Sequence, residues 1–370
     1  MMSRRTAVAG LCAALVAAAC SDAVTPTVPQ PLFSFSPNGI TPSRPANGSL
    51  NESGTQLAKG FDPKNPRLGD AVIASFFWLG SSSVDSVIDF IADANNTRPG
   101  NIYHRVDSVS AGGYTMVTYV ATNIQNFPDS SSVSGQILAV RAYLHQPVSD
   151  GGIKISAWSG VDDNFSLALN DHATASGIDT GSSIPAHTRP IAVNAGGLAY
   201  TATMGALDST GFTGLGVPSG FTSVGRGSDN RILEDGAFAL QASAGTVDPQ
   251  WTWVYGPPAR PWLVTTFSLN AAPPPNSPPT VDAGPDETVL TGLMFTENAT
   301  FSDPNNDGPW TYRIDWGDGS STTGTATSQG TISAGHSYAT ILPQSFTLRV
   351  TVTDSHGASG LDTKIVSVAL

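Results

Sequence analysis

The sequence predicts an all-β protein in which a larger antiparallel sandwich precedes a smaller one. Charged residues make up only 12% of the 370-residue chain, whereas glycine (38) and proline (27) are abundant, as short strands joined by turns require. Only four of the 29 acidic residues are glutamate, so most of the acid is aspartate, which favours turns over helices. Apolar side chains recur in short runs and alternations without a helical period.

The chain begins with a basic start, an apolar run over residues 7–19 and small residues before Cys20. This run is too short to span a bilayer, so we expect a signal peptide over residues 1–20. Ala17-Ala18-Ala19-Cys20 resembles a bacterial lipobox, which implies acylation of Cys20 and attachment to a membrane through the lipid. Ser21 lacks the acid that retains such proteins at the inner membrane, so we expect an outer-membrane lipoprotein. The same alanines fit ordinary signal peptidase, which gives a secreted protein, and an uncleaved anchor is a third alternative.

Residues 21–60 are rich in Pro, Ser, Thr, Asn and Gly and show almost no apolar periodicity. Such a segment buries too little apolar surface to offset the entropy lost on ordering. We therefore expect a disordered tether. Both cysteines of the chain, Cys12 and Cys20, lie in the predicted leader, so no disulfide stabilises the domains that follow.

A first domain is predicted over residues 61–270. Residues 71–79 form a continuous apolar run, as expected of a strand that is covered on both faces. Turn-forming clusters separate further strand candidates, at residues 84–91, 102–106, 114–121, 136–144, 153–158, 197–205, 236–242 and 262–269. So many short strands indicate one large sandwich.

Four short motifs follow one another along this domain. They are Val87-Ile88-Asp89, Ile155-Ser156-Ala157-Trp158-Ser159-Gly160-Val161, Gly220-Phe221-Thr222 and Trp262-Leu263-Val264-Thr265-Thr266-Phe267. Their order resembles a jelly-roll or concanavalin-like β-sandwich module of secreted, multidomain bacterial proteins. The resemblance implies a jelly-roll-like fold and a non-catalytic surface module.

Residues 271–279 read Ala-Ala-Pro-Pro-Pro-Asn-Ser-Pro-Pro and mark the clearest boundary in the chain. Consecutive prolines favour extended polyproline II, so we expect a semi-rigid spacer between two domains.

The second domain is predicted over residues 280–370. Residues 312–316 alternate and then stop at Gly317-Asp318-Gly319, as a half-buried strand entering a tight turn does. Together with His336-Ser337-Tyr338 and the strand that ends in Val350-Thr351-Val352-Thr353-Asp354, this turn resembles the PKD domain. The resemblance implies an immunoglobulin-like sandwich, common in bacterial surface proteins, and we expect Trp316 and Tyr338 in its core.

Oxygen-bearing side chains alternate in Asp303-Pro304-Asn305-Asn306-Asp307-Gly308, as in the first half of a Ca²⁺ loop. Ile314 stands where a bidentate glutamate would be needed, which excludes the helix-loop-helix calcium motif. Some collagenase-associated PKD domains bind Ca²⁺ at the corresponding end, so the resemblance implies a looser site. Its candidate ligands are Asn276, Ser302, Asp303 and Asp307. The alternative is an Asx-rich turn without a metal.

Trp251, Trp253 and Tyr255 are spaced by two residues, so on a strand they share one face. Such a row forms either part of the core, or a flat ligand platform for sugar rings, or an inter-domain contact.

Catalytic signatures are missing from the sequence. There is no Gly-x-Ser-x-Gly elbow and no close metal-binding pair among the six histidines. Asp171 and His172 are adjacent, but no serine or cysteine follows or precedes them at a spacing typical of a catalytic triad. Glu234 and Asp235 are also adjacent, so on a strand their side chains point to opposite faces and cannot act as a glycosidase pair. We therefore expect a protein that is not an enzyme.

The formal net charge of −12, without a cluster of lysine or arginine, excludes phosphate-backbone binding and hence nucleic acid as a partner. The predicted function is non-catalytic adhesion to, or recognition of, an extracellular polymer or protein at the cell envelope. A carbohydrate-binding module in the larger domain is one alternative, and an extracellular hydrolase with a PKD accessory domain is another.

Overall fold

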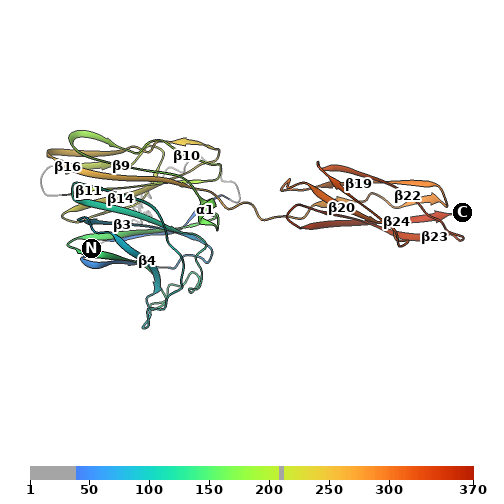
Figure 1. The fold of residues 1–370 in the computed structure, drawn as a ribbon, viewed down its shortest axis with the longest axis horizontal. Helices are drawn as coiled ribbons and strands as arrows, with labels where there is room; N and C mark the ends of the chain where they lie inside the picture. Colours follow the sequence, from blue (N-terminus) through green and yellow to red (C-terminus); the bar gives the residue numbers. More distant parts are fainter. Residues whose placement is uncertain (1–38, 208–211) are drawn as a thin grey trace, which may run out of the picture. The chain divides into compact units, whose positions relative to one another are not determined.

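The computed structural model describes residues 39–207 and 212–370 (Figure 1). Its contacts divide the chain into two compact units, one ending at Ala272 and the other comprising Pro273–Leu370. We call them the larger unit and the C-terminal unit. The predicted signal peptide, Cys20 and the first part of the predicted tether lie outside the described residues. Within the described residues, no helix has the length and apolarity needed to cross a membrane.

The described part of the larger unit is built from strands and one four-residue helix, α1 (Phe165–Ala168). The strands are β1 (Thr41–Ser49), β2 (Gly54–Gly60), β3 (Ala71–Leu79), β4 (Val84–Ile91), β5 (His104–Ala111), β6 (Tyr114–Ala121), β7 (Leu138–Val148), β8 (Gly151–Ser159), β9 (Leu169–Ala186), β10 (Ile191–Val193), β11 (Leu198–Ala206), β12 (Phe212–Gly216), β13 (Thr222–Ser228), β14 (Ile232–Leu240), β15 (Gly245–Val247) and β16 (Trp251–Leu269). The all-β prediction is confirmed.

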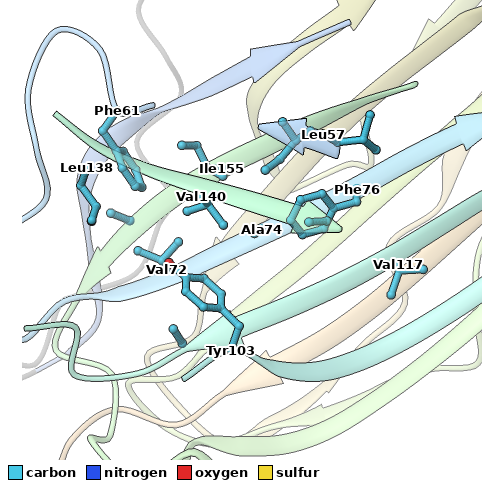
Figure 2. Packing of buried hydrophobic residues seen from close by; sticks show 14 of the residues in the cluster. Leu57, Phe61, Val72, Ala74, Phe76, Tyr103, Val117, Leu138, Val140 and Ile155 are labelled. Carbon is cyan, nitrogen blue, oxygen red and sulfur yellow. The ribbon is translucent and has the colours of Figure 1, made fainter. Parts of the chain in front are cut away.

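Three sheets of the larger unit are stacked, and β3 lies in the middle one (Figure 1). The middle sheet has the order β1-β8-β3-β6-β5; on one side lies β2-β7-β4 and on the other β12-β16-β11-β14-β13, with β9 paired to β16. Figure 2 shows the first interface, where Val72 and Phe76 of β3 pack with Val140 of β7. Ile73 and Phe77 point the other way, into a second cluster with β11 and β16. The continuous apolar run therefore serves two cores, as its pattern predicts.

The tether predicted for residues 21–60 is wrong for its second half, because β1 and β2 are strands. β1 pairs antiparallel with β8, and β2 pairs with β7. Main-chain hydrogen bonds hold these polar strands, supplemented by single apolar anchors such as the fully buried Leu57. A second anchor is polar: the Arg44 guanidinium donates to the carbonyl of Asn65, with its Nε 2.6 Å away. The larger unit therefore begins before residue 61.

The C-terminal unit is a two-sheet sandwich. Its strands are β17 (Thr280–Asp282), β18 (Glu287–Leu290), β19 (Met294–Ser302), β20 (Trp310–Asp315), β21 (Ser321–Ala326), β22 (Gly330–Ser337), β23 (Gln344–Thr353) and β24 (Ser359–Ala369). One sheet has the order β17-β19-β22 and the other β18-β24-β23-β20-β21. Along β19, buried and exposed residues alternate strictly, so one face covers the core.

The core of the C-terminal unit contains the two predicted aromatic anchors, Trp316 and Tyr338, which are both almost completely buried. The Tyr338 hydroxyl donates to the carbonyl of Trp316 at 3.0 Å, and the Trp316 indole N–H donates to Thr322 Oγ1 at 3.0 Å. His336 stacks on the Trp316 ring and bonds Asp318 Oδ2 at 2.8 Å. These contacts fix the Gly-Asp-Gly turn against the core.

Candidate functional site

Three carboxylates converge at one end of the C-terminal unit: Asp303, Asp307 and Asp354. One carboxylate oxygen from each lies within 4.8 Å of those of the other two. Asp303 and Asp307 belong to the loop after β19, and Asp354 directly follows β23. We call these three residues the acidic cluster. Carboxylate oxygens gathered in this way are typical ligands of Ca²⁺.

Asp303 is held in place by neighbouring donors. The Trp310 indole N–H donates to its Oδ2 at 2.6 Å, and the Asn305 backbone N–H donates to its Oδ1 at 3.0 Å. Burial alone raises the pKa of Asp303, but the hydrogen bonds that its carboxylate accepts outweigh this effect and lower the pKa below its ordinary value. The carboxylate is therefore preorganised in its charged form.

Asp307 and Asp354 each keep one oxygen without a partner among the described residues. Asp354 is 5% exposed; its Oδ1 accepts the backbone N–H groups of His356 and Ala358, while its buried Oδ2 accepts none. Asp307 Oδ2 lies 2.7 Å from Nδ1 of His356, and its buried Oδ1 is also without a partner. Buried carboxylate oxygens without a donor are costly, and a cation between them removes that cost.

The structure brings together two of the four residues predicted as metal ligands. Asp303 and Asp307 are in the cluster, whereas Ser302 lies on the exposed face of β19 and points away from the buried Asp303. Among the described residues, Asn276 forms no hydrogen bond with the three carboxylates. Its neighbour Ser277 donates its N–H to Asn305 Oδ1 at 2.8 Å. The sequence pattern misses Asp354, since only the fold brings the end of β23 beside the loop after β19.

The ligand platform proposed for Trp251, Trp253 and Tyr255 is wrong, because all three side chains are 2% exposed or less. The first part of β16 lies over the outward face of β11. There the indole N–H groups of Trp251 and Trp253 donate to the hydroxyls of Thr201 and Thr203, at 3.1 and 3.0 Å. The row belongs to the core, which was one of the three alternatives. A spacing of two identifies a shared face but not what covers it.

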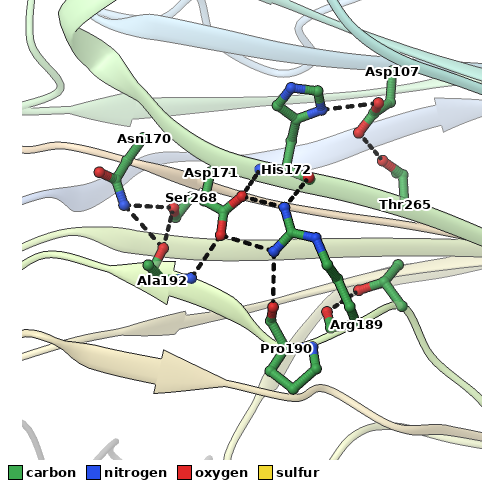
Figure 3. Close-up of polar contacts among 10 residues, drawn as sticks. Asp107, Asn170, Asp171, His172, Arg189, Pro190, Ala192, Thr265 and Ser268 are labelled. Atoms are coloured by element: carbon green, nitrogen blue, oxygen red, sulfur yellow. Dashed lines mark hydrogen bonds and ion pairs between the residues drawn. The ribbon is translucent and has the colours of Figure 1, made fainter.

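Asp171 and His172 point to different partners (Figure 3). Asp171 pairs with the guanidinium of Arg189, at 2.6 and 3.1 Å, and this pairing lowers its pKa to about 2. His172 Nδ1 lies 3.0 Å from Oδ1 of Asp107. Although Asp171 and His172 are adjacent in the sequence, they therefore do not form a catalytic dyad.

Glu234 and Asp235 also face opposite sides of β14. Asp235 accepts from Arg226 and Ser223. Glu234 is buried and pairs with Lys154 of β8, with Nζ 2.9 Å from Oε1. Burial raises the pKa of Glu234 to about 7, although the charge of Lys154 opposes this shift. Two carboxylates facing each other across a cleft, as a glycosidase requires, are not formed by this pair.

A cavity of about 600 Å³ with a mixed polar and apolar lining lies at one end of the larger unit, and the sequence patterns do not reveal it. Three segments line it: residues 100–102 with His104 at the start of β5, residues 122–123 after β6, and residues 163–166 at α1. We call it the loop pocket. The Thr122 hydroxyl donates to the carbonyl of Asp163 at 2.7 Å, which joins two of these segments.

Comparison with known proteins identifies the smaller of the two units. A family model for the PKD domain matches residues 276–369. Sixteen chains of solved structures match. One is the PKD domain of an M14-like peptidase from Thermoplasmatales archaeon SCGC AB-540-F20, with 22% identity and a TM-score of 0.22, covering 26% of this chain and 97% of that one. No curated protein matches the chain. On the family match and the two-sheet sandwich described above, the C-terminal unit is a PKD domain, an immunoglobulin-like module that is not itself catalytic.

Proposed function

We propose that this chain is a non-catalytic recognition protein that works outside the cytoplasm, with the larger unit contacting an extracellular polymer or protein. PKD domains occur in extracellular and secreted proteins, which supports this location for the C-terminal unit. The observation that carries the proposal is the loop pocket, because it offers a concave surface with polar side chains at the end of a rigid sandwich.

The arrangement of ionisable groups supports recognition over catalysis. His172, His336 and His356 each pair with an aspartate. A general base also needs a nucleophile within hydrogen-bond reach of its imidazole. Within the described residues, the hydroxyls of Thr265 and Ser320 bond the aspartates of two of these pairs, at 3.3 and 2.6 Å, and none bonds an imidazole. A hydrolase with a PKD accessory domain therefore has less support.

A retention assay tests the recognition function. The mature protein is incubated with insoluble cellulose, chitin, xylan and collagen, and the fraction removed from solution is measured together with any soluble product released. We expect retention on at least one polymer without release of product. Release of soluble fragments would favour the hydrolase, and a protein that none of these materials retains would speak against recognition.

We further propose that the acidic cluster binds Ca²⁺. Asp303, Asp307 and Asp354 supply the oxygens, and the two unpartnered ones on Asp307 and Asp354 mark where the ion would bind. A bound ion would join the loop after β19 to the turn after β23. A main-chain hydrogen bond already connects these two segments, since the Ser355 N–H donates to the carbonyl of Asp307 at 3.1 Å. Its role would be to stabilise the end of the PKD domain.

Thermal unfolding with and without calcium tests this site. Ligand binding stabilises the folded state by RT ln(1 + [L]/Kd), about 2.7 kcal/mol at a hundredfold excess over Kd. We expect millimolar Ca²⁺ to raise the Tm of the PKD domain relative to a chelator, and Asp354→Asn to abolish the difference. Asp282→Asn removes an exposed carboxylate of the same unit and should leave the response intact. An equal Tm with calcium and with chelator would exclude a specific site.

The attachment of the protein is also a proposal. Cys20 lies outside the described residues, and we propose that it is acylated and anchors the chain to the outer membrane. Labelling with a radioactive fatty acid should mark the wild type but not Cys20→Ala, and the variant should leave the membrane fraction. An unlabelled mature protein in the medium would instead show plain secretion.

A further inference from the structure

The loop pocket combines an aromatic surface with hydrogen-bonding groups that the fold leaves unused. The rings of His104 and Phe165 stack in parallel, with centroids 4.4 Å apart and planes 9° from each other. His104 is exposed and Phe165 half-buried, so the stack borders the cavity instead of filling it. Ile102, which is 70% exposed, adds aliphatic surface to the same cavity.

The position of this stack is set by the backbone around it. Asn101 donates through Nδ2 to the carbonyl of Gln125 at 3.0 Å, and its Oδ1 accepts the Gln125 N–H at 2.7 Å. The same amide donates to the buried carboxylate of Asp89. Asn101 is thereby fully engaged and fixes the segment before β5. The wall of the pocket is rigid, which reduces the entropy lost when a ligand binds.

Two asparagines at the pocket use their oxygens within the fold and keep their amide N–H groups. Asn123 Oδ1 accepts from the side-chain amide of Gln125 at 2.7 Å, and Asn164 Oδ1 caps α1 by accepting the Ser166 N–H at 3.0 Å. These bonds fix the orientation of both amides, and within the described part of the chain neither amide nitrogen donates to a partner. The Asp163 carboxylate likewise accepts no hydrogen bond within the described part of the chain. The pocket thus offers two donors and one acceptor around an aromatic surface.

The charge of the pocket restricts the ligand. Asp163 is the one carboxylate among the lining residues, and neither lysine nor arginine lines the cavity. A phosphate or an acidic peptide would meet a carboxylate without a compensating cation. A neutral ligand with many hydroxyls would satisfy the amides and Asp163, and its C–H face would cover the ring stack.

We propose that the loop pocket binds one or two neutral sugar residues of an extracellular polysaccharide. The inference rests on the recognition function proposed above and names the ligand class of the same surface. The volume of about 600 Å³ lies within the range of small-molecule sites, about 300–1,000 Å³. The proposed carbohydrate site is therefore the open loop pocket and not the aromatic row of β16, which is buried.

Depletion assays on insoluble cellulose, chitin and xylan test the proposal with the mature protein. We expect the double variant His104→Ala/Asp163→Ala to bind the retaining polysaccharide at least tenfold more weakly, and Phe165→Ala to weaken it as well. Short soluble oligosaccharides of the same sugar should compete with retention of the wild type. A matched control is His145→Ala/Asp85→Ala, which removes an exposed histidine–aspartate pair on β7 and β4 and should bind as the wild type does.

The outcomes separate this proposal from the broader one. If collagen retains both the wild type and the pocket variant while no polysaccharide does, recognition stands and the sugar pocket is refuted. If a polysaccharide retains wild type and pocket variant equally, with unchanged Tm, sugar binding lies elsewhere and the pocket is again refuted. If none of the materials retains the protein, both proposals fail.

Discussion

In the described part of each unit, a lysine–glutamate pair is buried between the sheets. In the larger unit, Lys154 of the middle sheet meets Glu234 of the outer sheet, with 2.9 Å between Nζ and Oε1. In the C-terminal unit, Lys364 of β24 meets Glu297 of β19, with 2.7 Å between Nζ and Oε2. Both lysine side chains are at most 6% exposed. In both units, which contain no cysteine in their described part, a buried ion pair thus connects two facing sheets.

The surroundings of the two lysines differ. Lys364 has a second carboxylate, Glu287, at 2.9 Å, and this glutamate side chain is 43% exposed. Lys154 instead donates to the carbonyl of Gly225 at 2.5 Å. The backbone is close here, because a Cβ on Gly227 would overlap Glu234 Oε1. In the larger unit, Glu234 is therefore the one carboxylate among the described residues that neutralises the buried lysine. We expect the stability of the larger unit to depend more on this ion pair than the stability of the C-terminal unit depends on Lys364 and Glu297.

The largest expected effect comes from breaking that pair. Lys154→Met leaves Glu234 buried without its cation, which should lower the free energy of unfolding by about 3–5 kcal/mol. Hydrogen exchange followed by mass spectrometry on the whole chain should show faster exchange in β8 and β14, while the C-terminal unit is unchanged. Lys64→Met replaces an exposed lysine of the same unit and should have no effect.

Replacing both partners separates the cost of an orphaned charge from the value of the pair. Lys154→Met/Glu234→Leu restores apolar packing between the sheets, so most of the lost stability should return. If the double variant is as unstable as Lys154→Met, the attraction between Lys154 and Glu234 holds the sheets together, and the uncompensated charge of Glu234 is not the cause of the lost stability.

A smaller effect is expected from pH. Burial raises the folded-state pKa of Glu234 to about 7, from an ordinary value of 4.5. Between these values the unfolded chain releases the proton while the folded chain keeps it, so stability falls as pH rises and then levels off above the folded pKa. The groups that act on Glu234 are Lys154, Arg226 and Asp235. We expect the larger unit to be less stable at pH 8 than at pH 5, by on the order of 1–3 kcal/mol.

The double variant also provides the control for the pH experiment. Lys154→Met/Glu234→Leu has no carboxyl group at this position, so denaturant unfolding between pH 5 and pH 8 should show a flatter profile than the wild type. Identical profiles for both proteins would assign the pH dependence to other groups and contradict the raised pKa of Glu234.

Strands with a clear apolar pattern could be predicted from the sequence, and strands held by the backbone could not. The unbroken run of β3 and the alternation of β23 follow from which faces are covered. By contrast, β1, β9 and β13 are polar and lack a predictive pattern. They form because neighbouring strands offer unpaired N–H and C=O groups, and that depends on the assembled sheet.

The same distinction applies to the candidate sites. Asp303 and Asp307 lie in one loop, so their spacing shows in the sequence, whereas Asp354 joins them only through the fold. The loop pocket draws on three separate segments, and no local pattern connects His104 with Phe165. Local motifs can indicate half of a site, and the topology supplies the rest.

The smallest expected effect tests the second carboxylate of the C-terminal unit. Glu287→Gln removes a partly exposed partner of Lys364 and leaves the fully buried Glu297 in place, so solvent screening should limit the loss to less than about 1 kcal/mol. Glu297→Gln removes the fully buried anion and leaves the lysine only the partly exposed Glu287, so it should cost several times more. Unfolding monitored by hydrogen exchange in β19 and β24 distinguishes the two variants. Equal losses would mean that Lys364 needs both carboxylates, and the C-terminal unit would then depend on its charges as much as the larger unit does.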